Sequence, residues 1–485
     1  MPLSASPTPE PSSGRRLLAN TGFRSVAEVG SKVATFALLT VLAREVGDDE
    51  LGVYLFAVSL AMLASTAADF GQDKVLTREV ARHPDQAEHY FGNTLALRLV
   101  VGLPAIVVLP LVVKLLGYGG KAPLVAAVVG FAVLAELLTT TCFAVYQSFE
   151  RVGFVPVVLL TERWFIAVGG IVVVLLGHSI LAVAVVFLVG ALIGLVLAVR
   201  LLVTRVVRVR LRADRRAWWP LMRAALPLGI AGVFSTILFR VDMTMLAAYK
   251  DAAVVGNYGV AYRLFETTLF LSYSVVAGAF PVYAKLDPDG DEPLGEVFAR
   301  TLKLATGLVV PLAVGLAVMA EPVVRLVFGT DFDDTPRALL LLTPAIAVFP
   351  VGYLSGYLLI ARNRERRLVV VYAALAVENI ASNLVLIPLL SLHGAAIATS
   401  ITQVLLAGIL LRMARRAAGG VDLAVAFVTP VAAAAAAGAV MWATRSSLAV
   451  AVGAGGMTYV AAFYLVDRQW FPDDTASLRG LLKRG

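Results

Sequence analysis

Residues 179–202 read SILAVAVVFLVGALIGLVLAVRLL, and this stretch holds a single charged side chain, that of Arg200. A helix of about 20 apolar residues is long enough to cross the hydrocarbon core of a bilayer. In water, the same surface would have to be covered by a large protein core. The segment therefore predicts a transmembrane helix.

Similar segments occur along nearly the whole chain of 485 residues, of which 59% are apolar and only 15% charged. The mean hydropathy is +0.85, and soluble domains carry about 25% charged residues. This composition excludes soluble enzymes, disulfide-stapled secreted domains and disordered proteins. The sequence predicts an all-α, polytopic membrane protein with about 14 transmembrane helices, at residues 22–45, 51–72, 90–116, 122–148, 152–176, 179–202, 220–248, 253–283, 299–320, 337–361, 368–390, 394–416, 422–443 and 447–466.

Lysine and arginine residues are distributed unequally between the connections. With the amino terminus placed inside, 28 of them fall in inside segments and 7 in outside segments. Basic loops are retained on the cytoplasmic side during insertion. The bias therefore predicts a multi-pass protein of the cytoplasmic (inner) membrane with both termini in the cytoplasm. It also accounts for the net charge of +8, so nucleic acid is not an expected partner.

A short internal repeat predicts two lobes. Gly52-Val-Tyr54-Leu-Phe-Ala57 and Gly256-Asn-Tyr258-Gly-Val-Ala261 both read G-x-Y-x-x-A at the start of equivalent predicted helices. Because an even number of spans separates them, the repeats would be parallel and related by a pseudo-twofold axis along the membrane normal. We expect two six-helix lobes followed by two further helices.

The expected organisation has five parts. They are a disordered cytoplasmic tail at residues 1–14, an N-terminal lobe at 15–203, a basic cytoplasmic linker at 204–219, a C-terminal lobe at 220–418, and helices 13 and 14 with a cytoplasmic tail at 419–485. The linker reads TRVVRVRLRADRRAWW. Its composition is typical of a positive-inside loop with an aromatic anchor, and also fits an amphipathic helix on anionic lipid.

Charged residues remain within the predicted spans. An ionised side chain there costs several kcal/mol unless it faces water or a partner, and guanidinium groups bind phosphate in a bidentate manner. We therefore expect an anionic substrate to bind the basic residues of the spans, which are Arg24, Lys32, Arg98, Arg163, Arg240 and Arg263. The acidic residues expected to balance charge or bind a coupling ion are Glu28, Asp69, Asp242 and Glu266, with Glu136, Glu162 and Glu378 at similar depth.

A structural interpretation of these charges stays open. Arg24 and Glu28 are four residues apart, and Arg263 and Glu266 are three residues apart, so each pair could form within its own helix. Charged residues near helix ends could also reach the interface with their long side chains.

Motifs of other functional classes are missing from the sequence. Gly119-Gly120-Lys121-Ala122 lacks the glycine spacing and the Ser/Thr of a Walker A element. The one cysteine, Cys142, excludes an internal disulfide, and the four histidines lack metal-ligand spacing. The aspartates of the turn GTDFDDTP are interpreted as a solvated loop. We expect no catalytic residues, no metal and no cofactor, and the short outside loops leave no room for a glycosyltransferase or ligase site.

Several motifs follow one another in a familiar order. They are Ala43-Arg44-Glu45-Val46-Gly47, Ala68-Asp69-Phe70-Gly71, Arg78-Glu79-Val80-Ala81, Arg240-Val241-Asp242, Phe328-Gly329-Thr330-Asp331-Phe332, Asn379-Ile380-Ala381-Ser382-Asn383 and His393-Gly394-Ala395-Ala396. Over residues 20–420 the chain resembles the polysaccharide (O-antigen type) flippases of the multidrug/oligosaccharidyl-lipid/polysaccharide exporter superfamily.

The resemblance implies a transporter that moves a polyprenyl-diphosphate-linked oligosaccharide to the outer leaflet by alternating access, for surface polysaccharide biosynthesis. It implies membrane lipids and the lipid-linked glycan as partners, a polysaccharide polymerase and glycosyltransferases as further partners, and a monomeric transporter. Two alternatives stay open within the superfamily. One is a lipid II flippase, since the two extra helices at the end of this chain resemble those of that branch. The other is a cation-coupled multidrug exporter. A non-transporting scaffold would be expected to lose the charges within the spans, and they are present.

Overall fold

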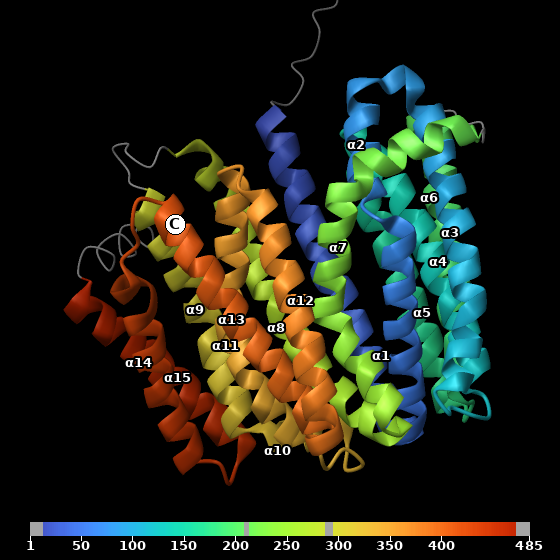
Figure 1. Ribbon diagram of the computed structural model, residues 1–485. Coiled ribbons are helices and arrows are strands. Elements are labelled where there is room, and N and C mark those ends of the chain that lie inside the picture. Colours follow the sequence, from blue (N-terminus) through green and yellow to red (C-terminus); the bar gives the residue numbers. More distant parts are fainter. Residues whose placement is uncertain (1–12, 208–212, 287–293, 472–485) are drawn as a thin grey trace, which may run out of the picture.

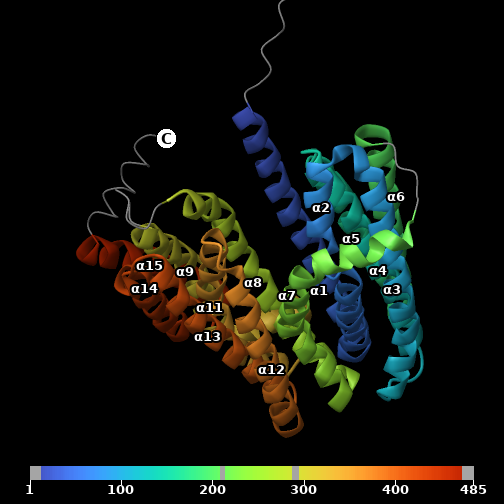
Figure 2. The same cartoon turned by 45° about the horizontal axis from the view of Figure 1, so that its top comes forward.

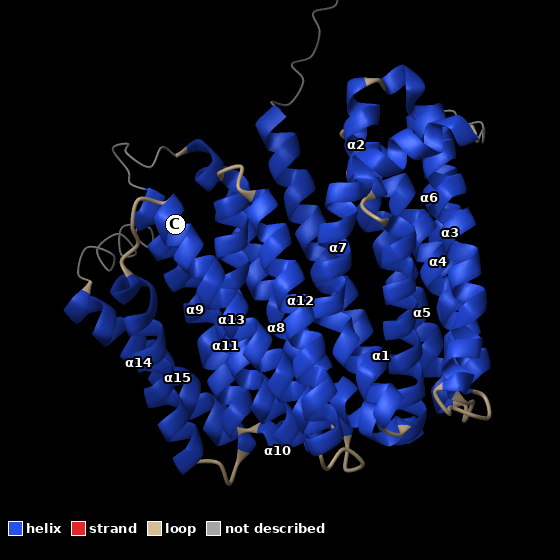
Figure 3. Cartoon of the chain, in the orientation of Figure 1, coloured by secondary structure: helices blue, strands red, loops and turns tan. Residues whose placement is uncertain are grey.

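The computed structural model describes residues 13–207, 213–286 and 294–471. Every regular element within these ranges is helical, and no strand occurs in them (Figure 3). The expected tail up to residue 12 and the linker residues 208–212 lie outside the described residues.

The helices follow one another with short connections (Figure 1). They are α1 (Ser13–Asp69), α2 (Gln72–Arg82), α3 (Ala87–Leu115), α4 (Ala122–Ser148), α5 (Phe154–Leu175), α6 (Ile180–Leu201), α7 (Arg215–Tyr249), α8 (Ala252–Lys285), α9 (Leu294–Val318), α10 (Ala320–Phe328), α11 (Thr335–Ala361), α12 (Glu365–Leu390), α13 (Leu392–Ala417), α14 (Leu423–Ala443) and α15 (Leu448–Trp470). A 3₁₀ turn spans Pro84–Gln86, and a π-helical turn spans Leu202–Val206.

Thirteen helical segments in the described part of the chain are long and apolar enough to cross a membrane. The first of them covers 54 residues, Val29–Arg82, which is far more than one crossing needs. The chain reverses inside it at Gly47, where φ is 75° and ψ is −178°, a conformation that favours glycine. Figure 1 shows the two arms of α1 running in opposite directions. The two arms are the first two predicted spans, so the expected all-α fold with about 14 crossings is confirmed.

Two groups of helices lie on either side of α1 and α7. Figure 2 shows α2–α6 on one side and α8, α9 and α11–α15 on the other. The helix α1 packs against α3, α4 and α5 of the first group and against α7 and α8. The helix α7 packs against α1, α2 and α12. Both helices therefore form the seam between the N-terminal and C-terminal halves.

The two glycines of the repeated motif meet at this seam. A Cβ atom on Gly52 would lie 1.8 Å from the carbonyl oxygen of Ala252, and one on Gly256 would lie 2.1 Å from that of Asp48. Each glycine thus packs against the residue four positions before the other glycine. The contact has twofold character, and it brings the backbones of α1 and α8 so close that no side chain fits at either position.

The structure adds two short helices that the sequence did not predict, α2 between the second and third spans and α10. The nine residues of α10 occupy part of the expected connection between the ninth and tenth spans. The helix is too short to cross a bilayer, so a search for long apolar segments could not find it. Nε of Arg44 in α1 donates a hydrogen bond to the carbonyl oxygen of Val327 at 2.9 Å, which ties α10 to the end of the first span.

The last two helices are attached to the body of the protein through α9. The Lys303 ammonium forms an ion pair with Asp467 of α15, and Thr306 donates to the carbonyl oxygen of Ala426 in α14 at 3.1 Å. Tyr459 donates to the carbonyl oxygen of Gly307 at 2.6 Å. Elsewhere α15 exposes large apolar side chains such as Met457 and Val460, as expected of a helix that faces lipid.

Candidate substrate cavity

A charged cavity of about 100 Å³ lies between α1, α4, α5, α6 and α8, and we call it the Arg163 cavity. Arg163 of α5, Glu136 of α4 and Arg263 of α8 form its charged lining. Nη2 of Arg163 lies 2.8 Å from Oε1 of Glu136 and 3.8 Å from Oε1 of Glu162. Because α8 belongs to the C-terminal half, this cavity lies where the two halves meet.

A second cavity of about 340 Å³ borders the first, and we call it the Arg240 cavity. It lies between α1, α4 and α7 and shares Met62 and Glu136 with the Arg163 cavity. Its lining is rich in hydroxyl groups, which come from Ser65, Thr66, Thr140, Ser235 and Thr236. The side chains of Thr66 and Thr236 are hydrogen bonded to each other at 3.1 Å across the two halves.

Glu266 of α8 joins the arginines of the C-terminal half. Its two carboxylate oxygens lie 2.7 Å from Nη2 of Arg240 and 2.9 Å from Nη1 of Arg263. The ion pair of Arg263 and Glu266 within α8, which the sequence allowed, is therefore formed. Arg240 of α7 joins it through the same carboxylate. Lys32 of α1 is exposed and interacts electrostatically with Glu266 and with the three arginines Arg163, Arg240 and Arg263.

The structure thus brings together four of the six basic residues expected at the site. Arg163, Arg240 and Arg263 form ion pairs with Glu136, Glu162 and Glu266, and Lys32 adds a fourth positive charge. The described part of the cluster therefore has an excess positive charge. The side chains of the three arginines are 18 to 30% exposed. A hydrated cluster of this kind can exchange a carboxylate partner for the phosphate of a ligand.

Arg98 lies behind this site. Its side chain is fully buried and forms ion pairs with Asp69 and, at 2.8 Å, with Asp73. It also donates to the carbonyl oxygen of Leu137 at 2.8 Å and to the hydroxyl of Thr140 at 3.2 Å. Leu137 and Thr140 line the Arg240 cavity, so Arg98 fastens the α1–α2 corner to the α4 wall of that cavity.

Asp242 occupies another place, between α7, α8 and α13. Its side chain is 2% exposed and accepts hydrogen bonds from Tyr258 at 2.5 Å and Thr399 at 3.0 Å. Among the described residues no basic side chain forms an ion pair with it. On α12, Glu378 accepts from Ser382 and Thr402, both at 2.7 Å. The side chains of Arg24 and Glu28 lie outside the described residues.

The hydroxyl groups of the Arg240 cavity were not predicted from the sequence. Serine and threonine are frequent in transmembrane helices, where they bond to their own backbone, so no local pattern marks those that line a cavity. Thr66 also donates to the carbonyl oxygen of Met62 at 2.9 Å.

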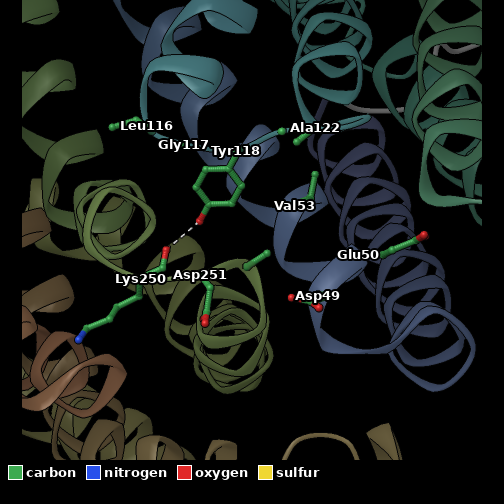
Figure 4. Close-up of a pocket in the computed structure, with 11 residues that line it drawn as sticks. Asp49, Glu50, Val53, Leu116, Gly117, Tyr118, Ala122, Lys250 and Asp251 are labelled. Atoms are coloured by element: carbon green, nitrogen blue, oxygen red, sulfur yellow. Dashed lines mark hydrogen bonds between the residues drawn. The ribbon is translucent and has the colours of Figure 1, made fainter.

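The end of the bundle opposite the start of α1 is held by contacts between the two halves, one of which Figure 4 shows. Tyr118, which follows α3, donates to the carbonyl oxygen of Lys250 at 3.2 Å, and Asn257 of α8 donates to Asp48 at 3.1 Å. Burial raises the pKa of Tyr118 to about 12, so its phenol stays protonated as a donor. A pocket of about 400 Å³ at this end is lined by Asp49, Glu50 and Asp251 among others.

Comparison with known proteins identifies the family. The model of the family described as polysaccharide biosynthesis protein matches residues 17–287 of the 485. The chain belongs to this family. The match includes α1–α8, apart from residues 13–16, and therefore all the residues that form the two cavities.

Of two relatives of this family member, one is described as a flippase and the other as a lipopolysaccharide biosynthesis protein. The chain is 22% identical to the probable low-salt glycan biosynthesis flippase Agl15 of Haloferax volcanii over 382 residues, 78% of this chain and 79% of that protein. It is 24% identical to the lipopolysaccharide biosynthesis protein WzxC of Escherichia coli, over 67% of this chain and 66% of that protein.

Solved structures show the same fold. The lipid II flippase MurJ, in an inward closed conformation, has a TM-score of 0.77 at 14% identity, over 92% of this chain and 98% of that one. An inward-facing multidrug resistance MATE family transporter of the MOP superfamily has a TM-score of 0.64 at 14% identity, over 80% and 94%. The family match and the relative described as a flippase confirm the resemblance to polysaccharide flippases, which are transporters rather than enzymes.

Proposed function

We propose that this protein moves a polyprenyl-diphosphate-linked oligosaccharide from the cytoplasmic to the outer leaflet of the cytoplasmic membrane, for surface polysaccharide biosynthesis. The observation that carries the proposal is the convergence of Arg163, Arg240 and Arg263 on two adjoining cavities between the halves of the molecule. The family, and relatives described as acting in glycan and lipopolysaccharide biosynthesis, support it.

The chemistry of the two cavities suits the two parts of such a headgroup. Arginines bind a diphosphate strongly, because the guanidinium fork matches two phosphate oxygens. The hydroxyl groups of Ser65, Thr66 and Ser235 can exchange hydrogen bonds with sugar hydroxyls. The prenyl chain needs no polar site, because it can stay in the bilayer.

Transport requires the site to open to one side at a time. We propose that the halves at 15–203 and 220–418 rock about α1 and α7, with the contacts of Gly52 and Gly256 closing the outer end in the present conformation. The distribution of basic residues supports this orientation, with both termini in the cytoplasm. Opening would break the hydrogen bonds of Tyr118 and Asn257.

The carboxylates have separate roles in this proposal. Glu136 and Glu266 pair with the arginines in the absence of substrate and release them to phosphate. Asp242 is the best placed of the acidic residues to bind a coupling proton or cation, because it is buried and has oxygen neighbours instead of a basic partner. Arg98 and Asp69 act as positioning residues for the cavity wall.

The test is export in cells that depend on this protein. We expect Arg163→Ala, Arg240→Ala and Arg263→Ala each to lower surface polysaccharide at least tenfold and to raise the pool of lipid-linked precursor. The lysine variants at these positions should keep part of the activity, since they keep the charge. Arg366→Ala, which removes an exposed charge outside both cavities, is the matched control. Normal export by the three alanine variants at wild-type protein levels would refute the proposal.

A lipid II substrate is the second candidate, favoured by the fold match to a lipid II flippase over 92% of this chain. Lipid II also carries a diphosphate, so the arginines alone do not distinguish the two substrates. Expression in cells depleted of their own lipid II flippase separates them. Rescue of growth would identify lipid II as a substrate, and failure to rescue by a well-expressed protein would favour the surface glycan.

A further inference from the structure

The last turns of α13 carry three exposed arginines on one side of the helix. Arg412, Arg415 and Arg416 are spaced three and four residues apart, so their side chains lie over the same surface. Together with Gly408, Leu411 and Gly420 they line a pocket of about 560 Å³. This α13 pocket lies at the same end of the bundle as the start of α1, and it shares no lining residue with the two cavities described above (Figure 1).

Two of the residues that line the pocket, Gly408 and Gly420, have no side chain and leave space open. Gly408 lies one helical turn before Arg412, and no atom of the described residues would come within 4 Å of a Cβ atom placed on it. The same is true of Gly420, where φ is 123°. The arginines therefore border a hollow at the protein surface, instead of projecting from a smooth helix into water.

Nothing in the described part of the chain neutralises these arginines. None of the three forms an ion pair there, whereas the neighbouring Arg300 is paired with Glu296 at 2.7 Å. The carboxylate of Asp422 accepts from the backbone N–H of Ala424 at 2.8 Å, as the N-cap of α14, and does not line the pocket. The hollow thus has a local charge of about +3, which calls for an anion.

The surface next to the pocket shows which anion fits. The exposed side of α13 continues from Gly408 toward the middle of the helix through Ile401, Val404 and Leu405, whose side chains are 41 to 46% exposed. One face of a single helix is therefore apolar along the membrane interior and cationic at its end. A phospholipid has the same order of parts, with acyl chains beside a phosphate. A free phosphate would use only the arginines.

We propose that the α13 pocket binds the headgroup of an anionic phospholipid from the leaflet on the side of the amino terminus, with its acyl chains along Ile401, Val404 and Leu405. The three guanidinium groups would hold the phosphate and the hollow beside Gly408 would hold the glycerol. This site is separate from the transport cavities and does not depend on the function proposed above.

Two variants test the site in different ways, with the purified full-length protein in detergent. Arg412→Gln/Arg415→Gln/Arg416→Gln removes the charge. Gly408→Leu fills the hollow and keeps every charge, and there is open space around the Cβ atom that it adds. We expect phosphatidylglycerol binding, measured by native mass spectrometry and by the rise in Tm with added lipid, to fall at least tenfold in the first variant and at least fivefold in the second.

The control is Arg364→Gln/Arg366→Gln/Arg367→Gln, which removes the same charge at the start of α12, outside the pocket. It should bind phosphatidylglycerol like the wild type, and phosphatidylcholine should bind weakly to all variants. Equal losses in the control and the pocket variants would show general electrostatic attraction and overturn the proposal. So would undiminished binding by Gly408→Leu, or displacement of the lipid by inorganic phosphate at equal concentration.

Discussion

Gly52 of α1 and Gly256 of α8 are equivalent in the two repeats, and each packs on the backbone of the other's helix. The motif that is repeated in the sequence therefore also forms a contact between the two helices in the structure. Because backbone atoms cannot rotate away as side chains can, this crossing is a close fit that any larger residue would disturb.

The first prediction concerns that crossing. We expect Gly256→Val to separate the two helices, because its side chain would meet the carbonyl oxygen of Asp48. A cysteine introduced at Thr236, in the Arg240 cavity, should then react at least three times faster with a membrane-impermeant maleimide added from outside. Gly453→Val is the matched control, since Gly453 has open space around it. An unchanged labelling rate in a folded Gly256→Val variant would contradict the closure that we assign to this contact.

The second prediction concerns Arg98. Removal of one partner from a buried ion pair costs about 3–5 kcal/mol, and Arg98 has two such partners, Asp69 and Asp73. We expect Arg98→Ala to lower the Tm of the purified protein strongly, and Arg98→Lys to recover only part of it because lysine lacks the guanidinium fork. Arg78→Ala, at an exposed pair with Glu79, should change the Tm little. Equal effects of the two alanine variants would argue against the positioning role.

The third prediction uses the triad of Arg240, Arg263 and Glu266. Glu266→Gln leaves two arginines close together without a shared carboxylate, so the free energy of unfolding should fall. Arg240→Gln in the same chain relieves that repulsion, and the double variant should therefore be more stable than Glu266→Gln alone. A double-mutant cycle on Tm measures the coupling. Simple additivity of the two substitutions would show that the groups do not interact.

The fourth prediction concerns the orientation in the membrane. Cys142, the one cysteine of the chain, is buried, so an introduced cysteine can be labelled selectively. Ser446, in the connection between α14 and α15, should react from outside the cell once it is replaced by cysteine. Asp85, in the turn after α2, should react only after permeabilisation. The reverse result would invert the proposed topology.

The fifth prediction concerns the attachment of the last two helices. Asp467→Asn weakens the ion pair between Asp467 of α15 and Lys303 of α9. We therefore expect the Tm of the purified protein to fall markedly. Replacement of both residues, as Lys303→Met/Asp467→Leu, should restore most of it, because apolar residues of similar volume can replace a buried pair. A double variant that is less stable than Asp467→Asn would contradict this prediction. It would show that the ion pair stabilises the protein by more than the neutralisation of two buried charges.

The fold could be predicted from the sequence because apolar length decides whether a helix crosses a bilayer. Thirteen apolar helical segments lie where the spans were expected, and the double length of the first is explained by Gly47. The short helix α10 could not be found in this way, because its nine residues pack on α1 and α11 instead of crossing.

The candidate site could be predicted only in part. Arg98 and Arg163 look alike in sequence, since each is an arginine in an apolar segment. What separates them is Asp73, which lies next to Arg98 in space but was assigned to a connection between spans. The approach of Arg240 to Glu266 depends on how α7 packs against α8, and no spacing within one helix contains that information.

The ion pair of Lys303 and Asp467 has an evolutionary consequence. A relative whose chain lacked the equivalents of α14 and α15 would have no carboxylate to offer at that place, so a lysine there would lose this ion pair. We expect selection to have replaced it with an aliphatic residue in any such relative. The acquisition of the terminal hairpin and the appearance of that lysine should then coincide on the family tree.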